Sequence, residues 1–303
     1  MRGTTTTTMR HLISLVIAVV ASVAGSLMLW SGGGRALFEM SRFGLEGGAA
    51  GPIALAVAGA LLLGLAAFSI RFSPAGPLVV GAFAALGPLL MVLLPYDPIR
   101  GVNSPIVSVL DSLNDVDRGL AIGAFDFVAC GTAALIGFAL LGAGVVARPR
   151  PAGALWRVVS AVGGVLALAF AGWAFAAGAD FYRRSFVVLD PSVLSGASLL
   201  VAALLFGAAI APSGRSSIGA WIAGGVLTLV GALLFVVPPQ AFSVLPPQFL
   251  AGITTLGWSG QVLAVGLTLL GLALGVALRP VSLPRPQAPQ PQQGAAPSPG
   301  AAV

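Results

Sequence analysis

The sequence predicts an all-α integral membrane protein with about eight transmembrane helices. Apolar residues make up 57% of the chain, charged residues make up 8%, and the mean hydropathy is +1.01. Eight apolar runs follow one another, each long enough to cross ~30 Å of hydrocarbon, which takes about 20 helical residues. No run alternates apolar and polar residues as a membrane strand does, which argues against a β-barrel. The runs are 12–30, 52–70, 77–95, 120–146, 158–178, 193–211, 216–237 and 257–278.

The first run follows two arginines, Arg2 and Arg10, an arrangement that secretory signal peptides also have. The run is long for a signal peptide, and residues 30–32 form a poor cleavage site. We therefore expect an uncleaved first span, preceded by a cytoplasmic segment over residues 1–11.

Charged residues are divided unequally between the two sides of the predicted bundle. With eight spans, both termini and the even-numbered connections share one side, which carries nine arginines and no acid. The other side carries six arginines and all nine acids, so the positive-inside rule places both termini in the cytoplasm. All fifteen basic residues are arginine, a bias typical of a GC-rich genome, and we expect a bacterial plasma membrane. The arginines are too dispersed for a nucleic-acid-binding face, so no nucleic-acid partner is expected.

Two outer connections carry helical patterns of their own. Residues 104–105 form a Ser-Pro start signal, and apolar residues then recur opposite Asp111, Asp115 and Arg118, which predicts an amphipathic helix on the outer leaflet. Its apolar positions are Ile106, Val109, Leu110, Leu113 and Val116. The first outer connection has charges one helical turn apart, which predicts ion pairs within one helix. These charges are Arg35, Glu39, Arg42 and Glu46.

The order of landmarks along the chain suggests a duplication. The fourth run ends in LGAGVVARP at 141–149, and the eighth ends in LALGVALRP at 272–280. A repeat of four spans would relate halves over 12–148 and 149–279 by an axis along the membrane normal, in a parallel 4+4 arrangement. The alternative is that Gly- and Ala-rich helices resemble one another by composition alone.

Small residues and prolines set two further expectations. Ala56, Ala60 and Gly64 are spaced by four residues, which lets helix backbones approach closely within the bundle, or in a homo-oligomer as the alternative. The tail over 280–303 is rich in proline and predicts a disordered cytoplasmic segment, with a Pro-rich partner-binding role as the alternative.

Few residues carry recognisable chemistry. A single histidine and a single cysteine exclude a histidine-based triad, a zinc site and a disulfide framework within one chain, so no metal or cofactor is expected. Clustered carboxylates around the second outer connection form a candidate polar site, with a plain solvated face as the simpler explanation of the same residues. These are Asp97, Asp111, Asp115, Asp117 and Asp126. Arg183 and Arg184 are a candidate contact for a lipid phosphate, with snorkelling beside an aromatic anchor as the alternative.

Asp126 lies inside a predicted span, where an acidic residue commonly marks a functional site. A straight helix counted from Arg148 places Asp126 about 33 Å higher, at the outer interface. The same count from Arg279 places Gln261 in the outer part as well. Only weakly polar groups then remain near mid-depth, with no evident helix break there, which disfavours an ion-coupled carrier. These groups are Thr132, Thr228 and Thr268.

Three classes of function remain. We expect a non-enzymatic accessory or scaffold component of the cell envelope, which acts through helix packing, its outer loops or a membrane-protein partner. The alternative is a permease-type transporter of an apolar or lipid-like solute, which needs no charge at mid-depth. A lipid-processing enzyme that uses the outer carboxylates comes third, and no residue is assigned a catalytic role.

Overall fold

The computed structural model describes residues 2–43, 49–94, 105–147, 153–188, 192–236 and 255–279, and every regular element within them is helical. The elements before residue 150 are α1 (Arg2–Phe43), α2 (Ala50–Phe68), the 3-10 turn η2 (Ser69–Arg71), α3 (Ala75–Leu93), α4 (Pro105–Asn114), α5 (Arg118–Ala129) and α6 (Thr132–Val146). Those after it are α7 (Ala154–Tyr182), the π-helical turn η3 (Arg183–Val187), α8 (Val193–Ile210), the 3-10 turn η4 (Ala211–Gly214), α9 (Ile218–Val236) and α11 (Gln261–Ala277).

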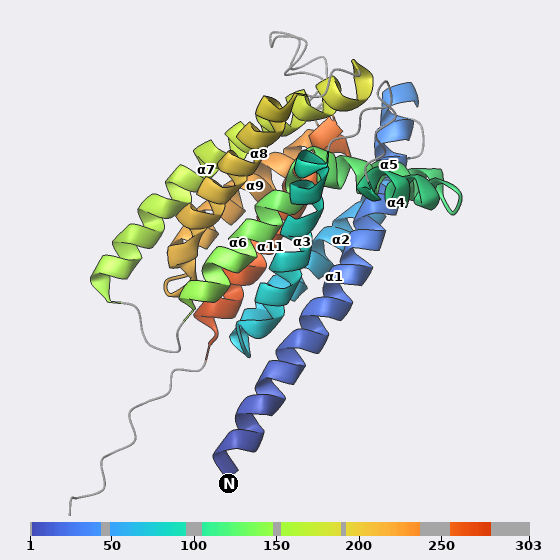
Figure 1. Ribbon diagram of the computed structural model, residues 1–303. Coiled ribbons are helices and arrows are strands. Elements are labelled where there is room, and N and C mark those ends of the chain that lie inside the picture. Colours follow the sequence, from blue (N-terminus) through green and yellow to red (C-terminus); the bar gives the residue numbers. More distant parts are fainter. Residues whose placement is uncertain are drawn as a thin grey trace, which may run out of the picture.

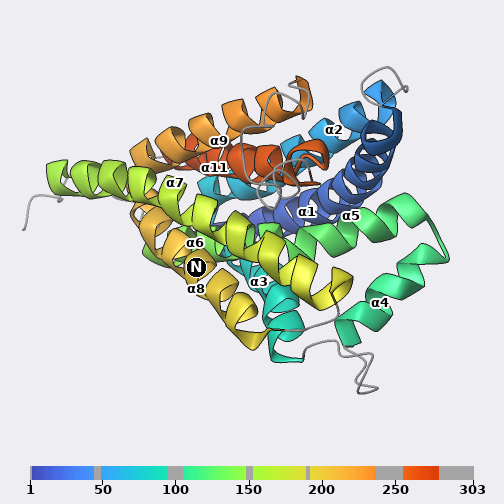
Figure 2. The ribbon, with the colours of Figure 1, turned by 90° about the horizontal axis from the view of Figure 1, so that it is seen from above.

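The long helices run side by side in one bundle, and α4 and α5 lie across it near the end opposite the N-terminus (Figures 1 and 2). Within these described ranges six helices are long and apolar enough to cross a membrane, and a seventh span results if the bent pair of α5 and α6 counts as one. The predicted all-α membrane class is therefore confirmed. In the described residues α11 has 17 residues, shorter than the other spans.

Two of the predicted runs are broken, which the sequence did not reveal. The fourth run forms α5 and α6, whose axes differ by 56°. The eighth run forms a short helical segment over 255–258, a turn at 259–260, and then α11. Both breaks fall at glycines with positive φ, Gly131 and Gly260.

The outer connections differ from the expected patterns. Helix α1 continues to Phe43, so Arg35 and Glu39 belong to the first long helix, while Glu46 and the side chain of Arg42 lie outside the described residues. The predicted helix after residue 104 is confirmed as α4. Val107 is buried against the protein, Val109 and Val116 of the predicted lipid-facing side are 63% and 77% exposed on its surface, and Arg118 already belongs to α5.

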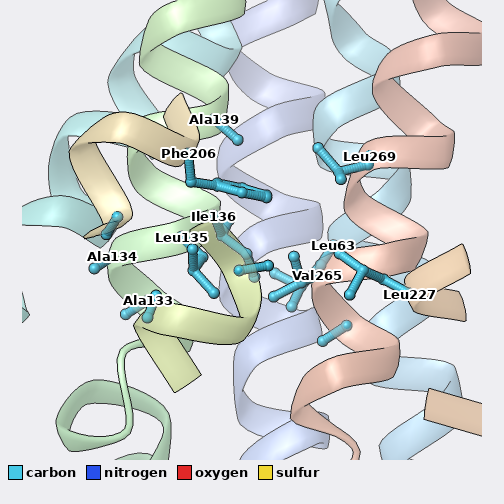
Figure 3. Close-up of a cluster of buried hydrophobic side chains, with 14 of the residues drawn as sticks. Leu63, Ala133, Ala134, Leu135, Ile136, Ala139, Phe206, Leu227, Val265 and Leu269 are labelled. Carbon is cyan, nitrogen blue, oxygen red and sulfur yellow. The ribbon is translucent and has the colours of Figure 1, made fainter. Parts of the chain in front are cut away.

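The middle of the bundle is packed with apolar side chains from several helices. Figure 3 shows Leu63 of α2 and Leu269 of α11 on one side, and Leu135 of α6 with Phe206 of α8 on the other. Small residues close the remaining gaps, because a Cβ on Gly271 would overlap the carbonyl oxygen of Gly64. The small-residue faces are thus used for packing within the bundle, as expected.

Helix neighbours follow the same order in both parts of the chain. α1 packs against α2 and α3, and α3 packs against α6. Likewise α7 packs against α8 and α9, and α9 packs against α11. The two groups meet through α2 against α11 and α8 against α6.

Candidate functional site

The candidate site lies where the two broken runs meet. Gly131 has φ +87° and precedes α6, and Gly260 has φ +73° and precedes α11. This left-handed backbone region favours glycine, which has no Cβ to clash with the neighbouring carbonyl. Glycine also offers no side-chain cap, so the first N–H groups of both helices lack the acceptor that Ser or Asp would supply.

The first residues of the two helices contact each other directly. Thr132 Oγ1 donates a hydrogen bond of 2.6 Å to Gln261 Oε1, and both side chains are buried. The amide Nε2 of Gln261 is buried and has no hydrogen-bond partner in the described part of the chain. Since the two residues touch, they lie at one depth, which corrects the expectation of Thr132 at mid-depth and Gln261 further out.

The depth of this contact can be measured along α1. Ser14 Oγ donates a hydrogen bond of 2.7 Å to the carbonyl oxygen of Ser73, in the turn between α2 and α3. Further along, Gly33 lies against the carbonyl oxygen of Ser259, directly before the second break. The separation of 19 residues along α1 corresponds to about 28 Å of helix, so the second break lies near the far end of the bundle.

Helix α7 gives the same result for the first break. Ser160 Oγ donates a hydrogen bond of 2.6 Å to the carbonyl oxygen of Ser216, in the turn between η4 and α9. Gly178 lies against the carbonyl oxygen of Cys130, directly before Gly131. Their separation of 18 residues corresponds to about 27 Å, close to the thickness of a hydrocarbon core.

Asp126 lies in α5, one turn before the first break, and only 1% of it is exposed. Its neighbours pack against aromatic rings, Phe125 against Tyr182 and Phe127 against Trp30, both with ring centres 5.8 Å apart. Carboxylate oxygen Oδ2 is buried without a hydrogen-bond partner in the described residues, and so is Nε1 of Trp30. An unpaired buried polar group costs about 1–3 kcal/mol, which suggests that a ligand or water completes the site.

The bend also changes how the depth of Asp126 is derived. The count from Arg148 assumed one straight helix, and that assumption is wrong because the run turns by 56° at Gly131. Asp126 still lies toward the bundle end opposite the N-terminus, since it lies beyond the first break. Its side chain, however, is enclosed by helices.

The other predicted aspartates do not gather around Asp126. Asp117 caps α5, because its Oδ1 accepts the N–H of Leu120 at 2.8 Å, and its Oδ2 pairs with Arg35 of α1. The hydrogen bond from the Leu120 backbone, with help from Arg35, lowers the pKa of Asp117 below its usual value. Asp111 and Asp115 are exposed, and Asp97 lies outside the described residues. Within the described ranges no group of three His, Cys, Asp or Glu side chains could hold a metal ion.

Arg183 and Arg184, the candidate lipid-phosphate contact, lie in the π-helical turn η3. Both pair with Asp180 of α7, Arg184 Nε at 2.8 Å and Arg183 at 3.6 Å. The arginine side chains are about half exposed, 53% for Arg183 and 42% for Arg184. The signal for this pairing is present in the sequence, because Asp180 lies three residues before Arg183 and four residues before Arg184, spacings that bring side chains together on a helix.

No known protein family, curated protein or solved structure matches this chain. Sequence reasoning missed the helix breaks because the runs contain many glycines that stay helical. The signal that could have revealed them is a polar residue directly after a glycine at corresponding places of two apolar runs, Thr132 after Gly131 and Gln261 after Gly260.

Proposed function

We propose that this chain is a permease-type protein of the bacterial plasma membrane that holds the polar head of a lipid-like solute at the two helix breaks. The observation that carries the proposal is the contact between Thr132 and Gln261, each the first residue of a helix that begins at a left-handed glycine. Discontinuous helices with polar groups where two halves of the chain meet are typical of transporter binding sites.

The proposal includes a duplication of four spans, which repeated backbone contacts support. Gly81 of α3 lies against Gly137 of α6, and Gly224 of α9 lies against Gly266 of α11. The same atoms are involved in both pairs, namely the carbonyl oxygen of the second glycine and the N–H group four residues after it. The residues carrying those N–H groups are Leu141 and Leu270. This pairing differs by two residues from the sequence landmarks, which align Leu141 with Leu272.

The contacts between the halves suggest a twofold axis. Gly142 of α6 lies against Gly207 of α8, and Gly271 of α11 lies against Gly64 of α2. Exchanging the halves turns one contact into the other. Thr132 and Gln261 would then be equivalent residues that touch each other, and such residues can only lie beside the axis.

An eight-span topology follows if α5 with α6 is one span and residues 255–258 with α11 are another. The N-terminus and the end of α11 lie at the same end of the bundle (Figure 1). The arginines of the connecting turns, such as Arg71 and Arg215, lie at that end, which favours cytoplasmic termini. A periplasmic reporter fused after Val303 should be inactive, and an active fusion would exclude this topology.

The apolar middle of the bundle limits the solute. Buried apolar side chains such as Phe206 and Leu269 (Figure 3) occupy the described bundle between its two ends, which opposes the passage of an ion. At the outer end, Gln261 Nε2 supplies an unused donor and Asp126 Oδ2 an unused acceptor. An amphiphile with a hydrogen-bonding head and an apolar body matches both features.

Flux in liposomes tests this function. The purified protein should accelerate transbilayer movement of a fluorescent phospholipid analogue, read by bleaching the outer leaflet with an impermeant reductant. D126N and Q261A should each slow this movement at least about tenfold, because each removes at least the free energy of one charge-assisted hydrogen bond to the solute. D111N removes an exposed carboxylate and is the matched control, with unchanged flux expected. A wild-type rate equal to that of protein-free liposomes, for phospholipids and for a panel of other amphiphiles, would refute the proposal.

The second candidate is a non-enzymatic accessory or scaffold component. Close backbone contacts at glycines favour it, because Gly163 lies against the carbonyl of Ala209 and Gly123 against that of Trp30, which makes the bundle rigid. Purification in a mild detergent should then recover a stoichiometric membrane-protein partner or a homo-oligomer, without any flux in liposomes. A monodisperse monomer with flux would exclude this role.

A further inference from the structure

Arg215 follows η4 at the bundle end that carries the N-terminus. Its guanidinium carbon lies 4.1 Å from the centre of the Trp156 ring, a cation–π contact between α7 and the turn before α9. The guanidinium makes no hydrogen bond or ion pair within the described ranges, and its Nε is buried without a partner. The charge is therefore held in place but not neutralised by these residues.

A carboxylate partner is absent from this end of the described structure. The acids that the structure describes lie along the far part of the bundle, at α4, α5 and the far ends of α1 and α7 (Figure 1). They are Glu39, Asp111, Asp115, Asp117, Asp126 and Asp180. An anion for Arg215 must then come from outside the described chain.

The surroundings of Arg215 fit a phosphate at the membrane surface. A guanidinium fixed on an aromatic ring presents its planar N–H fork to phosphate oxygens. Ser217 is half-buried two residues later, and its carbonyl accepts the N–H of Trp221 at 3.0 Å in the first turn of α9. Trp156 and Trp221 are aromatic rings of the kind that mark headgroup depth in a bilayer.

The corresponding turn between α2 and α3 is different. Arg71 is exposed, and its guanidinium carbon is 6.0 Å from the ring centres of both Phe68 and Phe72. The nearby hydroxyl of Ser73 is already used, since it accepts the N–H of Ala75 at 3.1 Å and lies 2.5 Å from Nδ1 of His11. Arg71 is therefore a basic residue at the same bundle end without the fixed stack.

We infer that Arg215, stacked on Trp156, binds the phosphate group of an anionic phospholipid in the leaflet next to the N-terminal end. Trp156 of this site lies 22 residues before Gly178 on α7, about 33 Å of helix from the first break, so the site does not depend on the proposed transport.

The test uses the full chain purified in a phosphate-free neutral detergent. Native mass spectrometry and thermal unfolding are recorded with phosphatidylglycerol, with phosphatidylcholine and with inorganic phosphate at matched ionic strength. Wild-type protein should retain phosphatidylglycerol and unfold at a higher temperature with it than with phosphatidylcholine. R215Q should bind phosphatidylglycerol about fivefold more weakly, the effect of one arginine near an anionic membrane surface.

Two further variants distinguish a specific loss of lipid binding from the effect of removing any charge and from a folding defect. R71Q removes the same charge from the same end and should keep wild-type affinity. R215K keeps the charge but loses the planar fork, and it should bind with intermediate affinity and unfold like the wild type without lipid. Equal affinity of R215Q and wild type, or an equal loss in R71Q, would overturn the inference. A stabilisation by inorganic phosphate alone that R215Q removes would assign the site to a free anion and overturn the lipid as its ligand.

Discussion

The two helix breaks have the same backbone and different side chains. Before Gly131, the chain carries Asp126 and Cys130, and at the same distances before Gly260 it carries Thr255 and Ser259. The backbone bonds agree, because Cys130 N donates to the carbonyl of Asp126 at 2.9 Å and Ser259 N donates to that of Thr255 at 3.2 Å. The two breaks share this backbone arrangement, and of these residues only Asp126, beside the first break, is a carboxylate. Under the proposed function, this difference would give the site two distinguishable halves, as a solute with a single polar head requires.

Replacing each break glycine with alanine should give the largest difference between the two breaks, measured as the loss in the free energy of unfolding. A Cβ on Gly131 would overlap Cδ1 of Leu199, which is itself buried, whereas a Cβ on Gly260 would lie 3.1 Å from the Phe235 ring. The left-handed backbone costs about 1–2 kcal/mol for alanine in both cases, and overpacking adds about 1–3 kcal/mol at Gly131. We expect G131A to lower the free energy of unfolding in detergent more than G260A does.

Gly172 of α7 supplies the control for this pair. A Cβ there meets nothing within 4 Å, so G172A should stabilise the helix by about 0.5–1 kcal/mol. Equal losses for G131A and G260A would mean that Leu199 relaxes and that the breaks are packed alike.

Much of the fold could be predicted from the sequence, because the length and the apolar composition of a span follow from the thickness of the bilayer. The glycines alone do not reveal the breaks, since a helical and a left-handed glycine look the same in an apolar run, and only the polar residues after them, Thr132 and Gln261, carry a signal. The burial of Asp126 depends on aromatic packing by residues far along the chain, such as Trp30 and Tyr182. The pairing of Arg35 was also missed, because its partner is Asp117 and not the neighbouring Glu39.

The second largest effect on stability should come from the hydrogen bond between Thr132 and Gln261, which joins the two breaks. T132V removes the hydroxyl that donates to Gln261 Oε1 and leaves the whole buried amide without a partner. Such an unsatisfied group costs about 1–3 kcal/mol in the free energy of unfolding. The double variant T132V/Q261L replaces both polar groups and should recover most of that loss, as chemical denaturation can measure. A double variant less stable than T132V would show that Gln261 has another partner.

Replacing Asp126 should lower activity without lowering stability, in contrast to the replacement of Thr132. One oxygen of its buried carboxylate, Oδ2, has no hydrogen-bond partner in the described residues, which opposes folding, so D126N should leave the free energy of unfolding unchanged or raise it by about 1 kcal/mol. Flux should nevertheless fall if the proposed function holds, because the proposed acceptor for the solute head is weakened. T255V tests the corresponding position of the second break and should change flux little. Loss of stability in D126N would instead indicate a structural hydrogen bond at that carboxylate.

The smallest effect concerns how α5 is held as it enters the first break. The pKa of Asp117 is lowered from its ordinary value of 3.8 in the folded state, mainly by the hydrogen bond from the Leu120 backbone and then by Arg35. A carboxylate with a lowered folded pKa contributes stability that is present above pH 3.8 and is lost as the pH falls through the lower folded value. D117A should remove the cap and cost about 1 kcal/mol at neutral pH.

D117N keeps a capping oxygen, so it should retain most of the stability that Asp117 provides while losing its share of the decline at acid pH. Thermal unfolding of the wild type, D117A and D117N from neutral pH down to about pH 3 measures this difference. An unchanged acid decline in D117N would assign that decline to other carboxylates, and the ion pair with Arg35 would then hold α5 no more firmly than the cap alone.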